Sequence, residues 1–90
     1  MVARYRNKTD IVAHILQAAQ AGPVTKTQIM YKTFISYEQL KTYLPLLTES
    51  GLLENGYGKD AQYATTEKGI KLLKMYDKIL EFVPMRPASS

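Results

Sequence analysis

Groups that could act in catalysis are few in this chain. His14 is the single histidine and there is no cysteine, which excludes disulfides and thiolate metal sites and leaves no second imidazole to share a metal ion. The pattern places no two carboxylates in a common pocket. The segment 56–58, Gly-Tyr-Gly, is followed by Lys59 and Asp60 instead of the helix that a phosphate-binding loop needs. We therefore predict that the protein is not an enzyme, that it has no cofactor, metal or small-molecule ligand, and that His14 is an ordinary surface residue.

The basic side chains are concentrated in the first half of the chain. The formal net charge is +4, from twelve Lys and Arg against eight Asp and Glu. Residues 1–45 contain six basic and two acidic side chains, whereas residues 46–90 contain six of each, so the whole excess lies in the first half. Such a distribution suits a polyanionic partner, because basic groups that neutralise phosphates release condensed counterions. Many unrelated basic proteins share this charge, so charge alone does not decide the function.

Residues 37–50 have the pattern of an amphipathic helix with a polar outer face. Three leucines recur at helical spacing and are expected to face the core: Leu40, Leu44 and Leu47. The opposite face and its flank carry Glu38, Gln39, Lys41, Thr42 and Pro45. In a DNA groove, Gln can pair with adenine, Lys with guanine or phosphate, and Thr with a base edge or a thymine methyl. The alternative is that these residues form a solvated face, as on any surface helix.

The elements that must hold this face are three helices with recognisable ends. Thr9 and Asp10 can cap a helix over 9–21, which Gly22 and Pro23 end. Thr25 is the expected N-cap of a short helix over 26–32. Ser36, with Gln39 three residues later, has the spacing of a capping box and begins the helix over 37–50. Pro45 lies inside that helix and is expected to kink it.

The second half of the chain changes to strand periodicity and then returns to helix. Residues 52–65 are predicted to form a β-hairpin, with turn-forming residues over 55–60 between two short strands. Thr65 or Thr66 then caps a last helix over 67–82, and Glu67 suits the positive end of its dipole. Residues 84–90, with two prolines, are predicted to be a flexible tail, and residues 1–8 a basic arm.

Mainly helical with a small β-hairpin, this order of elements predicts a winged helix-turn-helix domain of the α+β class over residues 9–83. In that architecture the third helix enters the major groove. The combination of segments 29–32, 36–44, 46–47, 51–53 and 63–69 resembles the short archaeal winged-helix DNA-binding proteins, which include chromatin-associated dimers and small transcriptional regulators. The resemblance implies that the partner is double-stranded DNA, and that the last helix forms a homodimer.

Candidate DNA contacts come from several elements. Helix N-termini attract phosphate, a tyrosine hydroxyl can donate to it, and the basic arm and the hairpin tip could reach a neighbouring groove. The candidates are Arg4, Arg6, Lys8, Thr25, Lys26, Thr27, Ser36, Tyr37, Gln39, Lys41, Thr42, Tyr57 and Lys59. For the arm and the hairpin tip, the alternative is a solvated segment.

The apolar surface of the last helix is wide for a helix that only covers its own domain. We predict that its distal part forms a homodimer interface, made of Tyr76, Ile79, Leu80, Phe82 and Val83. The alternative is that a domain with a thin core uses the whole apolar surface itself.

The competing function is a winged-helix module that binds a protein partner and leaves its basic face unused. Salt distinguishes the two, since DNA binding weakens steeply as salt rises and an apolar protein interface does not. No apolar run approaches the roughly 20 residues of a membrane span, and no signal peptide is recognisable. The expected location is therefore cytoplasmic and nucleoid-associated.

Overall fold

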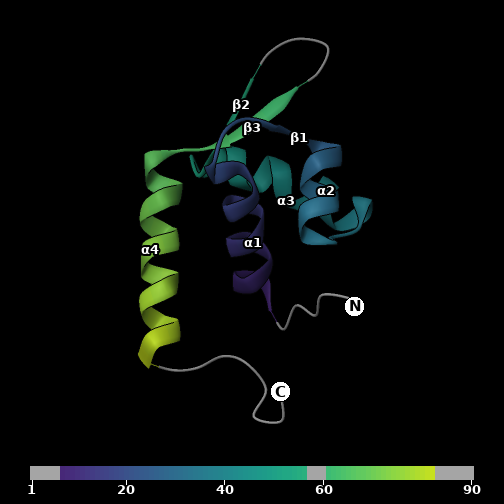
Figure 1. Cartoon of the computed structure of the whole chain (residues 1–90). Coiled ribbons are helices and arrows are strands. Elements are labelled where there is room, and N and C mark those ends of the chain that lie inside the picture. The colour runs from purple at the N-terminus through teal and green to yellow at the C-terminus, as the bar shows by residue number, and fades with distance from the viewer. Residues whose placement is uncertain (1–6, 57–60, 83–90) are drawn as a thin grey trace.

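The computed structural model of the 90-residue chain describes residues 7–56 and 61–82. The elements follow in the order α1 (Lys8–Gln20), β1 (Val24–Thr25), α2 (Lys26–Thr33), α3 (Tyr37–Glu49), β2 (Leu53–Asn55), β3 (Gln62–Thr65) and α4 (Glu67–Phe82) (Figure 1). The predicted α+β fold, mainly helical with a winged helix order, is confirmed. Most of the expected arm, the hairpin tip and the expected tail lie outside the described residues.

The small sheet has three strands where the sequence predicted a hairpin of two. β3 lies in the middle and pairs antiparallel with β2 on one side and with β1 on the other. The register places Val24 opposite Tyr63 and Leu53 opposite Thr65. β1 has only two residues. A strand this short carries no periodicity of its own, and it forms because β3 offers it a free edge.

The start of α1 corrects the predicted cap and the predicted arm. Asn7 is the N-cap, and its Oδ1 accepts from the backbone N–H of Asp10 at 3.0 Å. Lys8 therefore belongs to the helix and not to the arm. Asp10 is buried within the first turn, where its Oδ1 accepts a hydrogen bond of 2.8 Å from the hydroxyl of Tyr76 on α4. Thr9 and Asp10, the predicted caps, therefore lie inside the first turn of α1, after the residue that caps it.

α2 and α3 have the N-caps that the sequence predicted. Thr25 caps α2, and Gln28 completes a capping box with it, because its Oε1 accepts from the N–H of Thr25 at 2.9 Å. The Oγ of Ser36 accepts from the N–H of Gln39 at 3.2 Å at the start of α3. α3 is assigned as one helix through Pro45 to Glu49.

The core is organised around α1, which contacts α2, α4 and β3. Figure 1 shows α1 between α4 and the α2–α3 pair, with the sheet beyond its C-terminal end. The largest fully buried side chains come from α1, α2, α3 and β2: Ile15, Leu16, Ile29, Leu40, Leu47 and Leu53. His14 is half-buried instead of lying on the open surface, and its Nδ1 is 2.7 Å from the carbonyl oxygen of Asp10.

Several hydrogen bonds join the end of α3 to the start of α4, and this region is called the α3–α4 junction below. The Nζ of Lys68 donates to the carbonyl oxygen of Ser50 at 2.6 Å, and the Oγ1 of Thr66 donates to that of Gly51 at 2.6 Å. Gly69 packs against the same loop: a Cβ there would lie 2.5 Å from the carbonyl oxygen of Leu52. Only glycine allows α4 to approach so closely.

Among the described residues, no helix has the length and apolar character that a membrane crossing requires.

Candidate nucleic-acid interface

α3 is divided into a buried and an exposed face as its sequence predicts. Leu40, Leu44 and Leu47 are each at most 3% exposed. The exposed residues are Tyr37, Glu38, Gln39, Lys41, Thr42, Pro45, Leu46 and Glu49. Since the leucines fix the rotation of the helix in the domain, the polar side chains of Gln39, Lys41 and Thr42 lie on a free surface.

Lys41 and Tyr37 form one cluster on the first turns of α3. The Nζ of Lys41 lies 5.8 Å from the centre of the Tyr37 ring, within the range of a cation–π contact. Tyr37 is half-exposed, at 48%. The cluster places a positive charge and a phenol together near the N-terminal end of the exposed face. The hydroxyl of Thr42 donates to the carbonyl oxygen of Glu38 only at a long 3.4 Å.

The N-terminus of α2 contributes backbone donors and a second lysine. The capping box uses the N–H groups of Thr25 and Gln28. Lys26 and Thr27, which lie between them, are exposed and have first-turn N–H groups, which have no partner within a helix. Such groups favour an anion at this end of α2.

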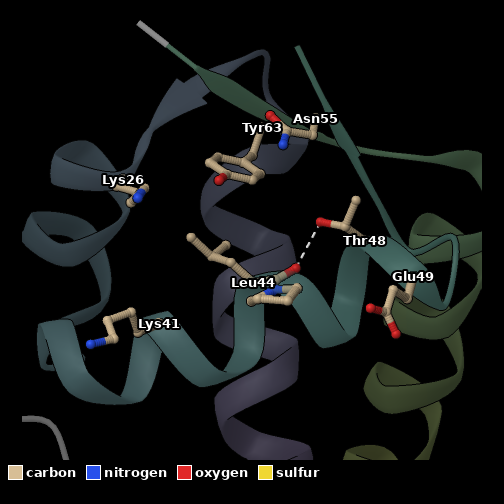
Figure 2. Close-up of a pocket in the computed structure, with 8 residues that line it drawn as sticks. Lys26, Lys41, Leu44, Thr48, Glu49, Asn55 and Tyr63 are labelled. Carbon is tan, nitrogen blue, oxygen red and sulfur yellow. Dashed lines mark hydrogen bonds between the residues drawn. The ribbon is translucent and has the colours of Figure 1, made fainter. Parts of the chain in front are cut away.

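A hollow of about 360 Å³ lies between α3 and the sheet, and both lysines line it; it is called the α3–sheet hollow below. It is lined by Lys26, Lys41, Leu44, Pro45, Thr48, Glu49, Asn55 and Tyr63. Figure 2 shows Lys26 and Lys41 at one end and Glu49 at the other. The hollow is therefore polarised along α3, and its lysine end suits a phosphate group.

Six lining residues of this hollow were not among the candidate DNA contacts: Leu44, Pro45, Thr48, Glu49, Asn55 and Tyr63. The hydroxyl of Thr48 donates to the carbonyl oxygen of Leu44 at 2.7 Å, the dashed line in Figure 2. Pro45 and Thr48 follow Lys41 by four and seven residues, so helical spacing indicates their shared side. Asn55 and Tyr63 belong to β2 and β3, and no pattern within α3 could identify them.

The other predicted contacts are distributed unevenly. Ser36 and Tyr37 lie at the start of α3, beside Gln39 and Lys41. Lys8 lies on the first turn of α1, at the end of that helix opposite to the sheet (Figure 1), and is not part of the α3–sheet hollow. Arg4, Arg6, Tyr57 and Lys59 lie outside the described residues.

α4 has an inner side that packs on its own domain and an outer side that is open. Leu73 is 4% exposed, and Leu72 and Tyr76 pack partly against the core. Met75, Ile79 and Phe82 are 61%, 50% and 82% exposed; at spacings of four and three residues they form one row, called the outer stripe below. Of the predicted interface residues, Ile79 and Phe82 are exposed, Leu80 is half-buried and Val83 lies outside the described residues.

Tyr76 is occupied within the chain, although it was a candidate for the dimer interface. Burial, and then the hydrogen bond to Asp10, raise the pKa of Tyr76 from 10.0 to about 12. The residue therefore ties α4 to α1 through its hydroxyl and leaves the outer stripe as the open part of the helix.

Within the described part of the chain, no three His, Asp or Glu side chains lie close enough to hold a metal ion.

Two comparisons with known proteins agree with this arrangement. The winged helix-turn-helix family matches the chain over residues 5–83. The crystal structure of Sso10a-2, a DNA-binding protein from Sulfolobus solfataricus, is similar to this fold with a TM-score of 0.77 and 26% sequence identity, over 86% of this chain and 81% of that chain. A search of curated proteins finds no match. The resemblance seen in the sequence is thereby confirmed, and the chain belongs to the winged helix-turn-helix family.

Proposed function

We propose that this protein binds double-stranded DNA with α3 in the major groove. The observation that carries the proposal is that Lys26 and Lys41 line the same end of the α3–sheet hollow, next to the exposed polar face of α3 (Figure 2). The lysines suit two phosphates on the groove edge, while Gln39 and Thr42 suit base edges. The similarity to a DNA-binding protein supports the same partner.

The second part of the proposal is that two copies bind together. The outer stripe of Met75, Ile79 and Phe82 is apolar and open. An antiparallel pairing of two α4 helices across a two-fold axis would cover it and present two α3 helices to one duplex. A protein of this kind acts on the nucleoid, as a transcriptional regulator or as an architectural protein.

A salt titration tests the proposed function. We expect the logarithm of the association constant for duplex DNA to fall linearly with the logarithm of salt concentration, at about 0.9 units per neutralised phosphate. The measurement is fluorescence anisotropy of a labelled duplex at three or more salt concentrations. Binding that is unchanged between low and moderate salt would contradict the proposal and favour a protein partner.

A further inference from the structure

Aromatic side chains are exposed at the turn between α2 and α3, away from the outer stripe. Tyr31 is 78% exposed and Phe34 is 66% exposed. Together with Thr27, Met30 and Ile35 they line a second hollow of about 370 Å³, called the turn hollow below. Apolar side chains of this size are normally buried, so two open rings lining one hollow indicate a partner.

The backbone of Phe34 strengthens this argument. Phe34 is the C-cap of α2 in the left-handed conformation, with φ 61 and ψ 21 degrees, and its N–H donates to the carbonyl oxygen of Met30 at 2.8 Å. Glycine or asparagine is the usual residue there, because a side chain with a Cβ is disfavoured. The ring does not compensate for this by burial, since it is mostly exposed.

The turn is held by its neighbours instead. The hydroxyl of Thr33 donates to the carbonyl oxygen of Ile29 at 2.7 Å and accepts from the N–H of Ile35 at 3.2 Å. Ile35 itself is buried, at 2% exposure. The ring of Phe34 is therefore not needed to fix this turn, and it is available to a molecule outside the fold.

The five residues that line the turn hollow are uncharged, and the charge of the segment that contains them points to the chemistry of that molecule. No acidic residue occurs over 25–37, whereas Lys26 and Lys32 lie on α2. Lys41 lies over the ring of Tyr37, three residues after Phe34. Proteins bind unpaired nucleotides with aromatic rings on which the bases stack and with lysines that hold the phosphates. Here Tyr31 and Phe34 supply the rings, and the exposed Lys32 follows Tyr31 on α2.

We propose that the turn hollow binds an unstacked base of DNA, by stacking on Tyr31 and Phe34. The inference rests on the proposed function, in that DNA is the partner, and goes beyond it, because a fully paired duplex offers no base to this hollow. The protein then prefers DNA with a gap, a bulge or a frayed step next to its binding site. The preference is tolerant of sequence, since every base has a π face.

Three DNA molecules test this inference by fluorescence anisotropy. The first is a fully paired duplex, and the second is the same duplex with a short segment of one strand removed, so that the opposite nucleotides are unpaired. The third is that gapped duplex with abasic sites in place of the unpaired nucleotides. The two gapped molecules share their backbone charge and flexibility, so only base contacts distinguish them. We expect the wild type to bind the gap with bases at least about fivefold more tightly than the abasic gap, the lower end of base stacking on an aromatic ring. The ratio should persist as salt rises, because stacking releases no counterions.

Two variants carry the test independently. Tyr31→Leu keeps an apolar helix-forming residue but removes the ring, and Phe34→Asn removes the ring while suiting the left-handed backbone. Both are expected to lose the preference for bases in the gap and to bind the paired duplex as the wild type does. Tyr31→Trp is the matched control and should keep the preference. Circular dichroism checks that each variant is folded.

The outcomes separate this inference from the proposed function. Paired duplex binding with no preference for bases in the gap, or a preference that survives in both variants, overturns the inference and leaves duplex binding intact. Failure to bind the paired duplex, with a preference that still depends on Tyr31, overturns the proposed function and supports this inference. Sedimentation that shows self-association lost in Tyr31→Leu and Phe34→Asn assigns the turn hollow to a second copy and overturns it.

Discussion

α3 and α4 are both amphipathic helices of one small domain, yet they expose opposite chemistry. α3 buries its leucine stripe and, apart from Tyr37, Pro45 and Leu46, exposes polar side chains. α4 buries Leu73 and Gly69 but leaves Met75, Ile79 and Phe82 open. The difference is that a single inward stripe satisfies α3, whereas α4 has apolar residues on two sides.

The two helices therefore suit different partners. The polar face of α3, next to two lysines, can form hydrogen bonds and ion pairs with phosphates and base edges. When no DNA is bound, water satisfies the same polar groups. The outer stripe gains only when water is removed from it, and the cheapest way to achieve that is pairing with an identical stripe. Substitutions in the leucine stripe of α3 should therefore change mainly stability. Substitutions in the outer stripe of α4 should change association and, through it, DNA affinity, and those on the exposed face of α3 should change the direct DNA contacts.

The largest effect is expected on the inner side of α3. Leu47→Ala removes a side chain that is 2% exposed and leaves a cavity, so the free energy of unfolding should fall by about 2 to 5 kcal/mol. Urea denaturation followed by circular dichroism measures this. The matched control is Thr42→Ala on the outer face of the same helix, which should change the stability by less than about 0.5 kcal/mol. Equal losses in the two variants would mean that α3 is not rotated as described.

A large effect on association is expected from the outer stripe. Replacing Ile79 and Phe82 together by Lys places charges in the proposed interface and should give a folded monomer by sedimentation velocity. DNA affinity should fall by roughly 100-fold, because the second α3 no longer binds as a tethered unit. Lys71 and Lys74 provide a control surface on the same helix, since their replacement by Gln should leave the dimer intact. A wild-type protein that stays monomeric at high concentration would contradict the proposal that the outer stripe of α4 pairs two copies.

A moderate effect is expected from single side chains on the outer face of α3. Lys41→Ala should weaken binding to all sequences and lower the salt slope by about 0.9, the value for one phosphate. Gln39→Ala should instead reduce discrimination between sequences by about 1 to 3 kcal/mol. Titrations with random and selected duplexes at several salt concentrations separate the two. Small, equal effects of both variants in a folded protein would show that α3 does not read the groove.

The smallest effect is expected at the contact between α1 and α4. Tyr76→Phe removes one hydrogen bond to Asp10 and should lower the free energy of unfolding by about 1 kcal/mol at neutral pH. Since folding raises the pKa of Tyr76 from 10.0 to about 12, the folded state favours the neutral phenol. That contribution is fully present below pH 10 and is lost as the pH rises through 12. The stability difference between wild type and Tyr76→Phe should therefore shrink over this interval, and a constant difference would contradict the assignment.

The parts of the site that depend on local spacing could be predicted from the sequence. The leucine stripe determines which side of α3 is free, so Gln39, Lys41 and Thr42 are correctly placed on an exposed face. The caps Thr25 and Ser36 are equally local, because a hydroxyl and a backbone N–H three residues later suffice to form them. The last helix shows both of its apolar sides in the sequence, but only the packing reveals which of the two remains open.

What depends on distant contacts could not be predicted. β1 forms only because its residues pair with β3, and Tyr63 reaches the α3–sheet hollow only through that sheet. Asp10 has the residue type of a cap, yet its partner is Tyr76, 66 residues later in the chain. The turn hollow could not be predicted for a different reason. Phe34 has the residue type of a core position, and only its left-handed backbone and its exposure identify it as a surface residue.

The α3–α4 junction has a consequence for how DNA sites can be spaced. Lys68, Thr66 and Gly69 hold the start of α4 against the loop that follows α3, so the angle between α3 and α4 is fixed within the chain. A dimer joined through α4 would behave as a rigid caliper with a fixed opening. Successive major grooves on one side of B-DNA recur at about 34 to 36 Å. Such a dimer would bind two half-sites only where their separation equals the distance between its two α3 helices. Adding half a helical turn between the half-sites moves the second one to the far side of the duplex, where the second α3 does not reach it.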